Sequence, residues 1–221
     1  MQFHTLDLQF HTSEVIATYA FESTDGIILI DPGPYSTHEH LLEALKAAGL
    51  KAEDVTHVLL THIHFDHAGA AWAWAKQGAK VYVHPAGYKH MLNPERLWNS
   101  AAQIYGDQME ALWGKMEPID DNLLLQPEDR ETLDIGGLSF DCHYTPGHAK
   151  HHIAYAIEDK VFSGDVAGCR IQNGPAQPPT PPPDIDVEAW DASIERLREI
   201  APKAVYPTHF GEVTNVPAHL E

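Results

Sequence analysis

Thr61-His62-Ile63-His64-Phe65-Asp66-His67 directly follows an apolar run, Val55 to Leu60, and is the stretch on which the interpretation of this chain depends. Three histidines and one aspartate fill four of the six consecutive positions 62 to 67. Crowding such groups costs desolvation and repulsion, and a cation bound among them reverses that cost. In extended chain the first two histidines point the same way, and the aspartate and last histidine follow on the turn that opens a helix. The stretch predicts one metal position and part of a second.

This stretch resembles the HxHxDH signature of the metallo-β-lactamase superfamily, and later motifs resemble the remaining ligand motifs of that family in the expected order. They are Thr145-Pro146-Gly147-His148 for the third histidine, Ser163-Gly164-Asp165 for the bridging aspartate and Thr208-His209-Phe210-Gly211 for the last histidine. Ile30-Asp31-Pro32-Gly33 resembles the early strand and turn that support the site. The resemblance covers nearly the whole chain, from about Phe21 to Gly211.

The resemblance implies a role for each of these residues. The first metal would be held by His62, His64 and His148, and the second by Asp66, His67 and His209. Asp165 would bridge the two metals, and Asp31 would orient a ligand histidine through its other ring nitrogen. Imidazole and carboxylate without thiolate suit two divalent cations, with zinc as the expected metal and iron or manganese also compatible.

The expected chemistry follows from such a metal pair. Two metals roughly 3.5–4 Å apart share a bridging water whose pKa falls toward ~7, which supplies a hydroxide nucleophile at neutral pH. Asp66 would be the catalytic residue, placed to accept or return a proton. Substrate-binding residues are not identified by the sequence.

Short β-patterned runs alternate with helical runs, which predicts an α/β fold. Strands are expected at residues 17–21, 26–30, 55–60, 80–84, 138–143, 153–157, 161–163 and 204–207, and helices at 38–48, 68–77 and 187–200. The run at 55–60 is too continuously apolar for a half-exposed strand. The resemblance adds the architecture: an αβ/βα four-layer sandwich in which two mixed β-sheets are flanked by helices.

Length and charge narrow the class of protein. The 221 residues, 43% of them apolar, suffice for one sizeable core, and a single domain over residues 1–221 is predicted. The formal charge of −18 disfavours nucleic acid as a partner. The chain opens without a signal-like segment and has no apolar run near the ~20 residues of a membrane span, so a cytoplasmic protein without a membrane partner is expected. Cys142 and Cys169 are predicted to be free thiols.

Two segments interrupt the alternation. Residues 85–125 form a long helical excursion with aromatic residues, which either packs on the sandwich or forms a lid over the metals. Residues 168–186 are extended by Pro175, Pro178, Pro179, Pro181, Pro182 and Pro183, either as a wall near Asp165 or as a surface connector.

Residues that differ from related branches of the superfamily disfavour three functions: flavodiiron redox chemistry, antibiotic resistance as the main role, and a lactonase that uses a tyrosine. Flavodiiron-type members carry a carboxylate where this chain has His64, and thiolate-ligand lactamases carry a cysteine where it has Asp165. Acyl-homoserine lactonases carry a tyrosine at the position of Gly168. Glyoxalase II-like thioesterases and persulfide dioxygenases share much of the ligand set, so neither is excluded.

We therefore predict a binuclear metal-dependent hydrolase acting on an ester, thioester, lactone or related small molecule. The alternatives are a mononuclear iron sulfur dioxygenase and a non-catalytic scaffold stabilised by metal. Exposed aromatics of the excursion would allow a homodimer contact. Many similar proteins continue past the last histidine motif into a helical region, whereas this sequence ends at Glu221. A short natural form and the absence of a substrate-binding or dimerising element are both compatible with it. The roles of His151, His152 and Cys169 are left open, and the other histidines are given none.

Overall fold

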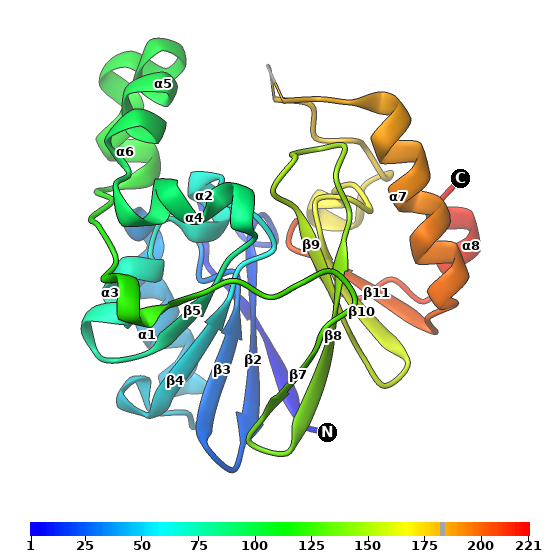
Figure 1. The fold of residues 1–221 in the computed structure, drawn as a ribbon, viewed down its shortest axis with the longest axis horizontal. Coiled ribbons are helices and arrows are strands. Elements are labelled where there is room, and N and C mark those ends of the chain that lie inside the picture. Colours follow the sequence, from blue (N-terminus) through cyan, green and yellow to red (C-terminus); the bar gives the residue numbers. More distant parts are fainter. Residues whose placement is uncertain (182–183) are drawn as a thin grey trace.

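Two β-sheets pack face to face and carry helices on their outer sides (Figure 1). This computed structural model describes residues 1–181 and 184–221. The strand order is β1-β2-β3-β4-β5-β6 in the first sheet and β11-β10-β9-β8-β7 in the second. The expected four-layer αβ/βα sandwich is confirmed.

The first sheet combines β1 (Phe3–Asp7), β2 (Ala17–Ser23), β3 (Gly26–Ile30), β4 (Val55–Leu59), β5 (Lys80–Tyr82) and β6 (Leu124–Leu125). Its β1, β2 and β3 pair antiparallel, whereas β3 to β6 run parallel. The second sheet combines β7 (Thr132–Ile135), β8 (Leu138–Tyr144), β9 (Ile153–Ile157), β10 (Lys160–Gly164) and β11 (Ala204–Pro207). Its pairs are antiparallel except β10 with β11, which are parallel.

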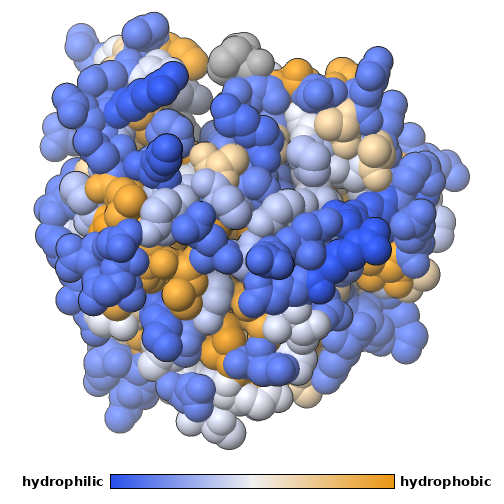
Figure 2. All heavy atoms as spheres, in the orientation of Figure 1, coloured by the Kyte–Doolittle hydropathy of each residue, from blue (hydrophilic) through white to orange (hydrophobic). Residues whose placement is uncertain are grey.

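The helices are α1 (His38–Ala47), α2 (Phe65–Ala68), α3 (Ala71–Lys76), α4 (Pro85–Leu92), α5 (Glu95–Tyr105), α6 (Met109–Trp113), α7 (Val187–Ile200) and α8 (Val216–His219). In Figure 1, α1 and α3 lie outside the first sheet, α7 and α8 outside the second, and α5 and α6 above one end of the first. Hydrophilic side chains cover most of the face drawn in Figure 2. Among the described helices, none is long and apolar enough to cross a membrane.

The central strands are buried on both faces, which explains their continuous apolar runs. In β3, Ile28 and Ile30 belong to the core between the sheets, whereas Ile27 and Leu29 face the core under α1 and α3. In the second sheet, Tyr155 enters the core between the sheets, and its neighbours in β9 pack toward α7. Each sheet therefore separates two apolar layers, and the alternation of side chains along a strand fills both.

The helix predicted over residues 68–77 is wrong in one respect, because the chain forms two short helices, α2 and α3, with a break at Gly69 and Ala70. The backbone N–H of Ala70 donates to the carbonyl of Gly33 (2.8 Å). A Cβ on Gly69 would lie 2.4 Å from the carbonyl oxygen of Phe65 and 3.0 Å from Cα of Pro34. The turn after β3 therefore packs against the break. The carbonyl of Gly33 in this turn accepts the N–H of Ala70, which in a continuous helix would donate within the helix. Three short strands, β1, β6 and β7, were not predicted.

Two buried tyrosines tie the sheets together near the ends of their strands. The hydroxyl of Tyr19 on β2 donates to the carbonyl of Pro207 on β11 (2.6 Å). The hydroxyl of Tyr155 on β9 donates to the carbonyl of Leu60, just past β4 (3.0 Å). Each sheet thus satisfies a carbonyl of the other at the edge where β4 and β11 end.

Tyr155→Phe should destabilise the fold, because the buried carbonyl of Leu60 loses the hydroxyl that donates to it. The free energy of unfolding should fall by about 1–3 kcal/mol. Urea denaturation of both proteins measures the change. Tyr88→Phe is the control, since its hydroxyl contacts the exposed Asp121 and its loss should change stability by less than about 0.5 kcal/mol. Equal effects of the two substitutions would contradict a special role for the inter-sheet bond.

Candidate metal centre

All seven predicted ligands lie together at one edge of the sandwich, where parallel strands of each sheet end. Two follow β4, two lie in α2, one lies between β8 and β9, one follows β10 and one follows β11. In this order they are His62 and His64, Asp66 and His67, His148, Asp165 and His209. Three overlapping groups of these residues have donor atoms within 4.8 Å of one another: His62 with His64 and His148, Asp66 with His67 and His209, and His62 with His67 and Asp165. We describe the first two as the first and second cluster, with Asp165 between them.

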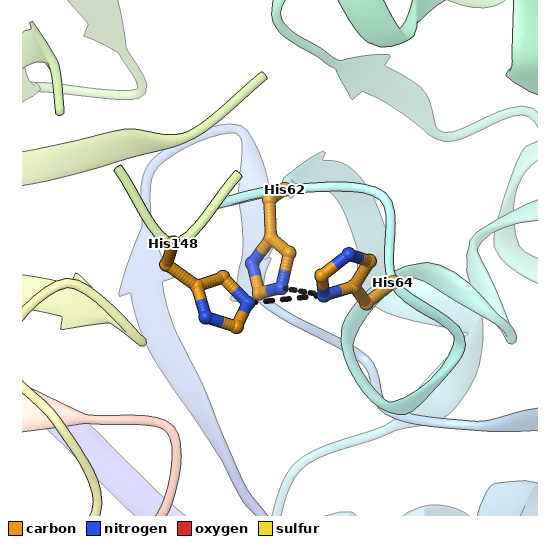
Figure 3. Close-up of side chains that lie close together, drawn as sticks. All are labelled: His62, His64 and His148. Carbon is orange, nitrogen blue, oxygen red and sulfur yellow. Dashed lines mark hydrogen bonds between the residues drawn. The ribbon is translucent and has the colours of Figure 1, made fainter. Parts of the chain in front are cut away.

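The first cluster consists of three imidazoles (Figure 3). Nδ1 of His64 lies 2.9 Å from Nε2 of His62 and 3.0 Å from Nε2 of His148. The three rings come from two segments that are far apart in sequence, and their nitrogens point toward one another. Such convergence suits a single cation that takes one nitrogen from each ring.

Hydrogen bonds at the outer ring nitrogens fix which nitrogens face inward without a proton. Nδ1 of His148 donates to the carbonyl of Pro179 (2.8 Å), so its Nε2 carries a lone pair. The hydroxyl of Thr61 donates to Asp31 (2.7 Å), so it accepts from Nδ1 of His62 (3.1 Å). Both Nε2 atoms therefore present lone pairs to the same point, as metal ligands do.

The environment keeps His62 and His64 neutral. Burial, and next the neighbouring His67, hold the pKa of His62 well below its ordinary value. Burial, and next His148, lower the pKa of His64 to about 4. Near neutral pH these two rings are unprotonated, which is the form that binds a cation.

The second cluster combines two imidazoles and two carboxylates. Nε2 of His209 lies 3.3 Å from Oδ2 of Asp66 and 3.6 Å from Oδ1 of Asp165. Nε2 of His67 lies 3.4 Å from Oδ1 of Asp165 and 3.8 Å from Oδ2 of Asp66. Nδ1 of His209 donates to the carbonyl of Val15 (2.7 Å), so its Nε2 faces the carboxylates.

Asp165 stands between the clusters. Its Oδ2 lies 3.3 Å from Nε2 of His148, while its Oδ1 faces His67 and His209. Oδ1 of Asp165 and Nε2 of His67 are buried and have no hydrogen-bond partner among the described residues. Buried polar atoms are rarely left unsatisfied, and a cation between these two would satisfy both. The donor set therefore fits two divalent cations with Asp165 reaching toward each.

Electrostatic shifts in the second cluster show strong mutual attraction. Burial acts to raise the pKa of the Asp165 carboxyl, but His67 and His209 outweigh it and hold that pKa well below its ordinary value. The pKa of Asp66 is lowered in the same way, against burial, by His67 and His209. Burial acts to lower the pKa of His67, but Asp165 and Asp66 raise it. A cation would replace the protons that this arrangement favours on the histidines.

Asp31 anchors the site from behind. Its carboxylate is fully buried and accepts hydrogen bonds from Nδ1 of His67 (2.7 Å), the hydroxyl of Thr208 (2.8 Å), and the hydroxyl (2.7 Å) and backbone N–H (2.8 Å) of Thr61. The predicted contact between Asp31 and a ligand histidine is therefore present. The two threonines were missed, although each directly precedes a ligand histidine in the sequence and could have been noticed there.

His152 positions the turn that carries Asp165. Its Nε2 accepts the backbone N–H of Asp165 (3.1 Å), so its Nδ1 donates to the hydroxyl of Thr145 (2.8 Å). Gly164 has a φ of +51°, and a Cβ there would lie 2.6 Å from Nε2 of His152. The role left open for His152 is thus a contact behind the site. His151 is also buried, but it lines the cavity in front of the clusters.

A cavity of about 300 Å³ opens in front of both clusters and is lined by His64, Asp66, His148, Asp165 and His209. The excursion contributes Leu97, Ala101, Ile104, Tyr105 and Trp113 to its wall. It therefore packs on the sandwich and also covers the cavity, so the two interpretations of residues 85–125 are compatible. The proline-rich segment contributes Pro179 and Pro181, which favours a wall over a mere connector. Pro182 and Pro183 lie outside the described residues.

Both cysteines are free thiols, as predicted. Cys142 is buried in the core between the sheets. The thiol of Cys169 donates to the carbonyl of Gln177 (3.2 Å), beside a backbone bridge between the same residues. Neither lines the cavity in front of the clusters.

Comparison with known proteins extends this picture. The family model described as the metallo-beta-lactamase superfamily matches residues 12–209. The metallo-beta-lactamase fold-containing protein ST1585 of Sulfurisphaera tokodaii is 35% identical over 167 residues, which cover 73% of this chain and 63% of that protein. The hydroxyacylglutathione hydrolase of Shewanella halifaxensis is 28% identical over 166 residues, which cover 73% of this chain and 52% of that protein. The matched region thus spans about half to two thirds of these relatives.

A solved structure shares the fold over almost the whole chain. The crystal structure of ST1585 from Sulfolobus tokodaii superposes with a TM-score of 0.80 at 29% identity, covering 99% of this chain and 82% of that one.

Asp31→Asn should weaken metal binding, because an amide cannot accept from Nδ1 of His67 and both threonine hydroxyls as the carboxylate does. Affinity for zinc should fall by about 10- to 100-fold. Competition against a chromogenic chelator measures it. Asp25→Asn removes the same charge from the exposed turn at the other end of β3 and should leave the affinity unchanged. Unaltered zinc affinity in the Asp31 variant would rule out this orienting role.

Proposed function

This chain belongs to the metallo-β-lactamase superfamily, and from that premise we propose that it is a binuclear metal-dependent hydrolase of a small molecule that carries an ester, thioester or lactone bond. One observation carries the proposal. The two donor clusters adjoin at Asp165 and open on one cavity, and the hydrogen bonds behind them turn ring nitrogens inward.

We assign the first cation to His62, His64 and His148, and the second to Asp66, His67 and His209, with Asp165 between them. When bound, two divalent cations would supply a Lewis acid for the attacked carbonyl and a water of lowered pKa. Zinc is our first choice because borderline dications favour imidazole with carboxylate.

Asp66 is our candidate for proton transfer. Asp66 and Asp165 both line the cavity, but the side chain of Asp66 is about 25% exposed and that of Asp165 only about 4%. The lowered pKa of Asp66 keeps it ionised near neutral pH, so its carboxylate can accept a proton and return it to a leaving group. His67 and His209 hold that carboxylate in place.

The cavity wall suits an apolar group on the substrate. Phe65 and Trp113 form a packed cluster with Tyr105 and Leu97, and all four line the cavity beside the donors. An apolar acyl or aryl group would bury against this wall while its carbonyl reaches the two clusters. The name of the relative from Shewanella halifaxensis, hydroxyacylglutathione hydrolase, supports an acyl compound as the substrate class.

The experiment that tests the function combines metal analysis with a substrate screen. Protein purified without added metal is analysed for zinc, iron and manganese, and assayed on chromogenic esters, thioesters and lactones before and after chelation. Two cations per chain with chelator-sensitive hydrolysis would support the proposal. A single iron with oxygen consumption and no hydrolysis would replace it with the sulfur dioxygenase, and metal-dependent stability without any turnover would leave a scaffold.

Asp66→Asn should reduce kcat by about 10²- to 10⁴-fold on the best substrate of the screen, because an amide cannot accept the proton. Metal content is measured in parallel, since Asp66 also belongs to the second cluster. The matched control is Asp107→Asn, which removes an exposed carboxylate just after α5. A variant with full kcat and full metal content would exclude Asp66 as the proton acceptor.

A further inference from the structure

Helix α5 separates two hollows of different character. Leu97, Ala101 and Ile104 line the metal cavity on one side of the helix. Arg96, Asn99 and Gln103 line a second groove of about 610 Å³ on the other side. Ser100 lines both, so the groove adjoins the metal cavity across one turn of α5.

The second groove, which we call the α4–α5 groove, is defined by Lys89, His90, Asn93, Glu95, Arg96, Asn99, Ser100 and Gln103. Every one of these side chains is polar, in contrast to the apolar wall of the metal cavity. Hydrophilic side chains also predominate on the face over α5 in Figure 2. A groove of this kind does not fit an apolar group and instead suits a charged or strongly polar one.

The charge of the groove is opposite to that of the protein. The chain carries a formal charge of −18 with only 14 lysines and arginines, yet two of these cations line this one groove. Lys89 and Arg96 form no ion pair with any described carboxylate, whereas six other lysines and arginines do. Glu95 is the acidic side chain that lines the groove.

A third cation acts on His90, which lines the groove. The pKa of His90 is lowered by burial and next by Arg96 and Lys150, while Asp184 acts in the opposite direction. Lys150 belongs to the loop that carries His148 and His151. Asp184 lines the metal cavity, which again places the groove beside the mouth of that cavity.

We propose that the α4–α5 groove binds an anionic group, a carboxylate or a phosphate, at the far end of the substrate, with Lys89 and Arg96 as its partners. This inference rests on the proposed function, because it makes the anion part of the molecule whose acyl end lies at the metal clusters. Arg96 precedes Ser100 by four residues, so the anion would bind about 6 Å along α5 from the rim that both hollows share. The groove thus selects substrates that are apolar at one end and anionic at the other.

Because the protein as a whole is acidic, selection of an anionic substrate requires cations close to the place where the anion binds. A protein of this net charge repels anions at long range, and that repulsion is screened beyond about 8–10 Å at physiological salt. Two unpaired cations within the groove would act inside this distance. They would therefore favour an anionic substrate at contact even though the whole molecule disfavours it at a distance.

Three inert probes test the groove without requiring turnover. They are a benzyl thioether that ends in a carboxylate, its primary amide, and the matching phosphate, none of which contains a hydrolysable acyl bond. Their affinities for zinc-loaded protein are measured by calorimetry. The charged probes should bind about three- to tenfold more tightly than the amide, and their order tells carboxylate from phosphate.

The double variant Lys89→Gln/Arg96→Gln should reduce this preference to less than about twofold. Lys46→Gln/Lys51→Gln removes the same charge from exposed positions on α1 and just after it, and should keep the preference. The charge-conserving Lys89→Arg/Arg96→Lys should restore it, which separates charge from altered folding.

Two outcomes would overturn the proposal. One is equal affinity for the charged probes and the amide in the unaltered protein. The other is a preference that persists in Lys89→Gln/Arg96→Gln, since the anion would then be held elsewhere, for example at the metals. The protein could also show a charge preference that depends on the groove but no hydrolytic activity. That result would support anion binding in the groove and contradict the proposed hydrolase function.

Discussion

The buried carboxylate of Asp31 is the constraint on which the site depends. A charge without solvent must be met by donors, and Asp31 receives four hydrogen bonds from Thr61, His67 and Thr208. These donors follow β4, lie in α2 and follow β11, so one side chain fixes three segments from both sheets. The backbone of Asp31 itself has a φ of +51°, a costly conformation for this residue. The bonds to its carboxylate, and the hydroxyl of Thr18 on its carbonyl (2.7 Å), offset that cost.

Around this anchor, four ligand histidines donate a hydrogen bond from the outer ring nitrogen, and each donates to a different acceptor. Asp31 serves His67, the carbonyl of Val15 serves His209, the carbonyl of Pro179 serves His148 and the hydroxyl of Thr61 serves His62. Each bond sets the tautomer and the ring plane together. The inward direction of these ring nitrogens therefore results from contacts within the protein, and the rings are oriented before a cation binds.

The sequence predicted the central strands and the proximity of the seven candidate donors, because both have a signal in side-chain identity. Continuous apolar runs reflect strands buried on both faces, as with Ile27 to Ile30, and the histidine and aspartate motifs lie together as expected. The carbonyls of Val15 and Pro179 could not be predicted, since any residue supplies a carbonyl and only the fold brings it to a histidine. The break between α2 and α3 depends in the same way on a backbone bond from Ala70 to Gly33. The two hollows beside α5 depend on how α4 and α5 pack, which periodicity alone does not give.

The division of each cluster between the two sheets has a consequence for how the protein is made. His62 and His64 follow a strand of the first sheet, whereas His148 comes from the second, and the other cluster is split likewise between Asp66 with His67 and Asp165 with His209. A cation bound in either cluster would therefore cross-link the two sheets and close a long loop of chain. On the ribosome the first cluster becomes complete only after His148 has emerged, and the second cluster only after His209 has emerged. Metal loading would thus be a late, non-local event in the maturation of this chain.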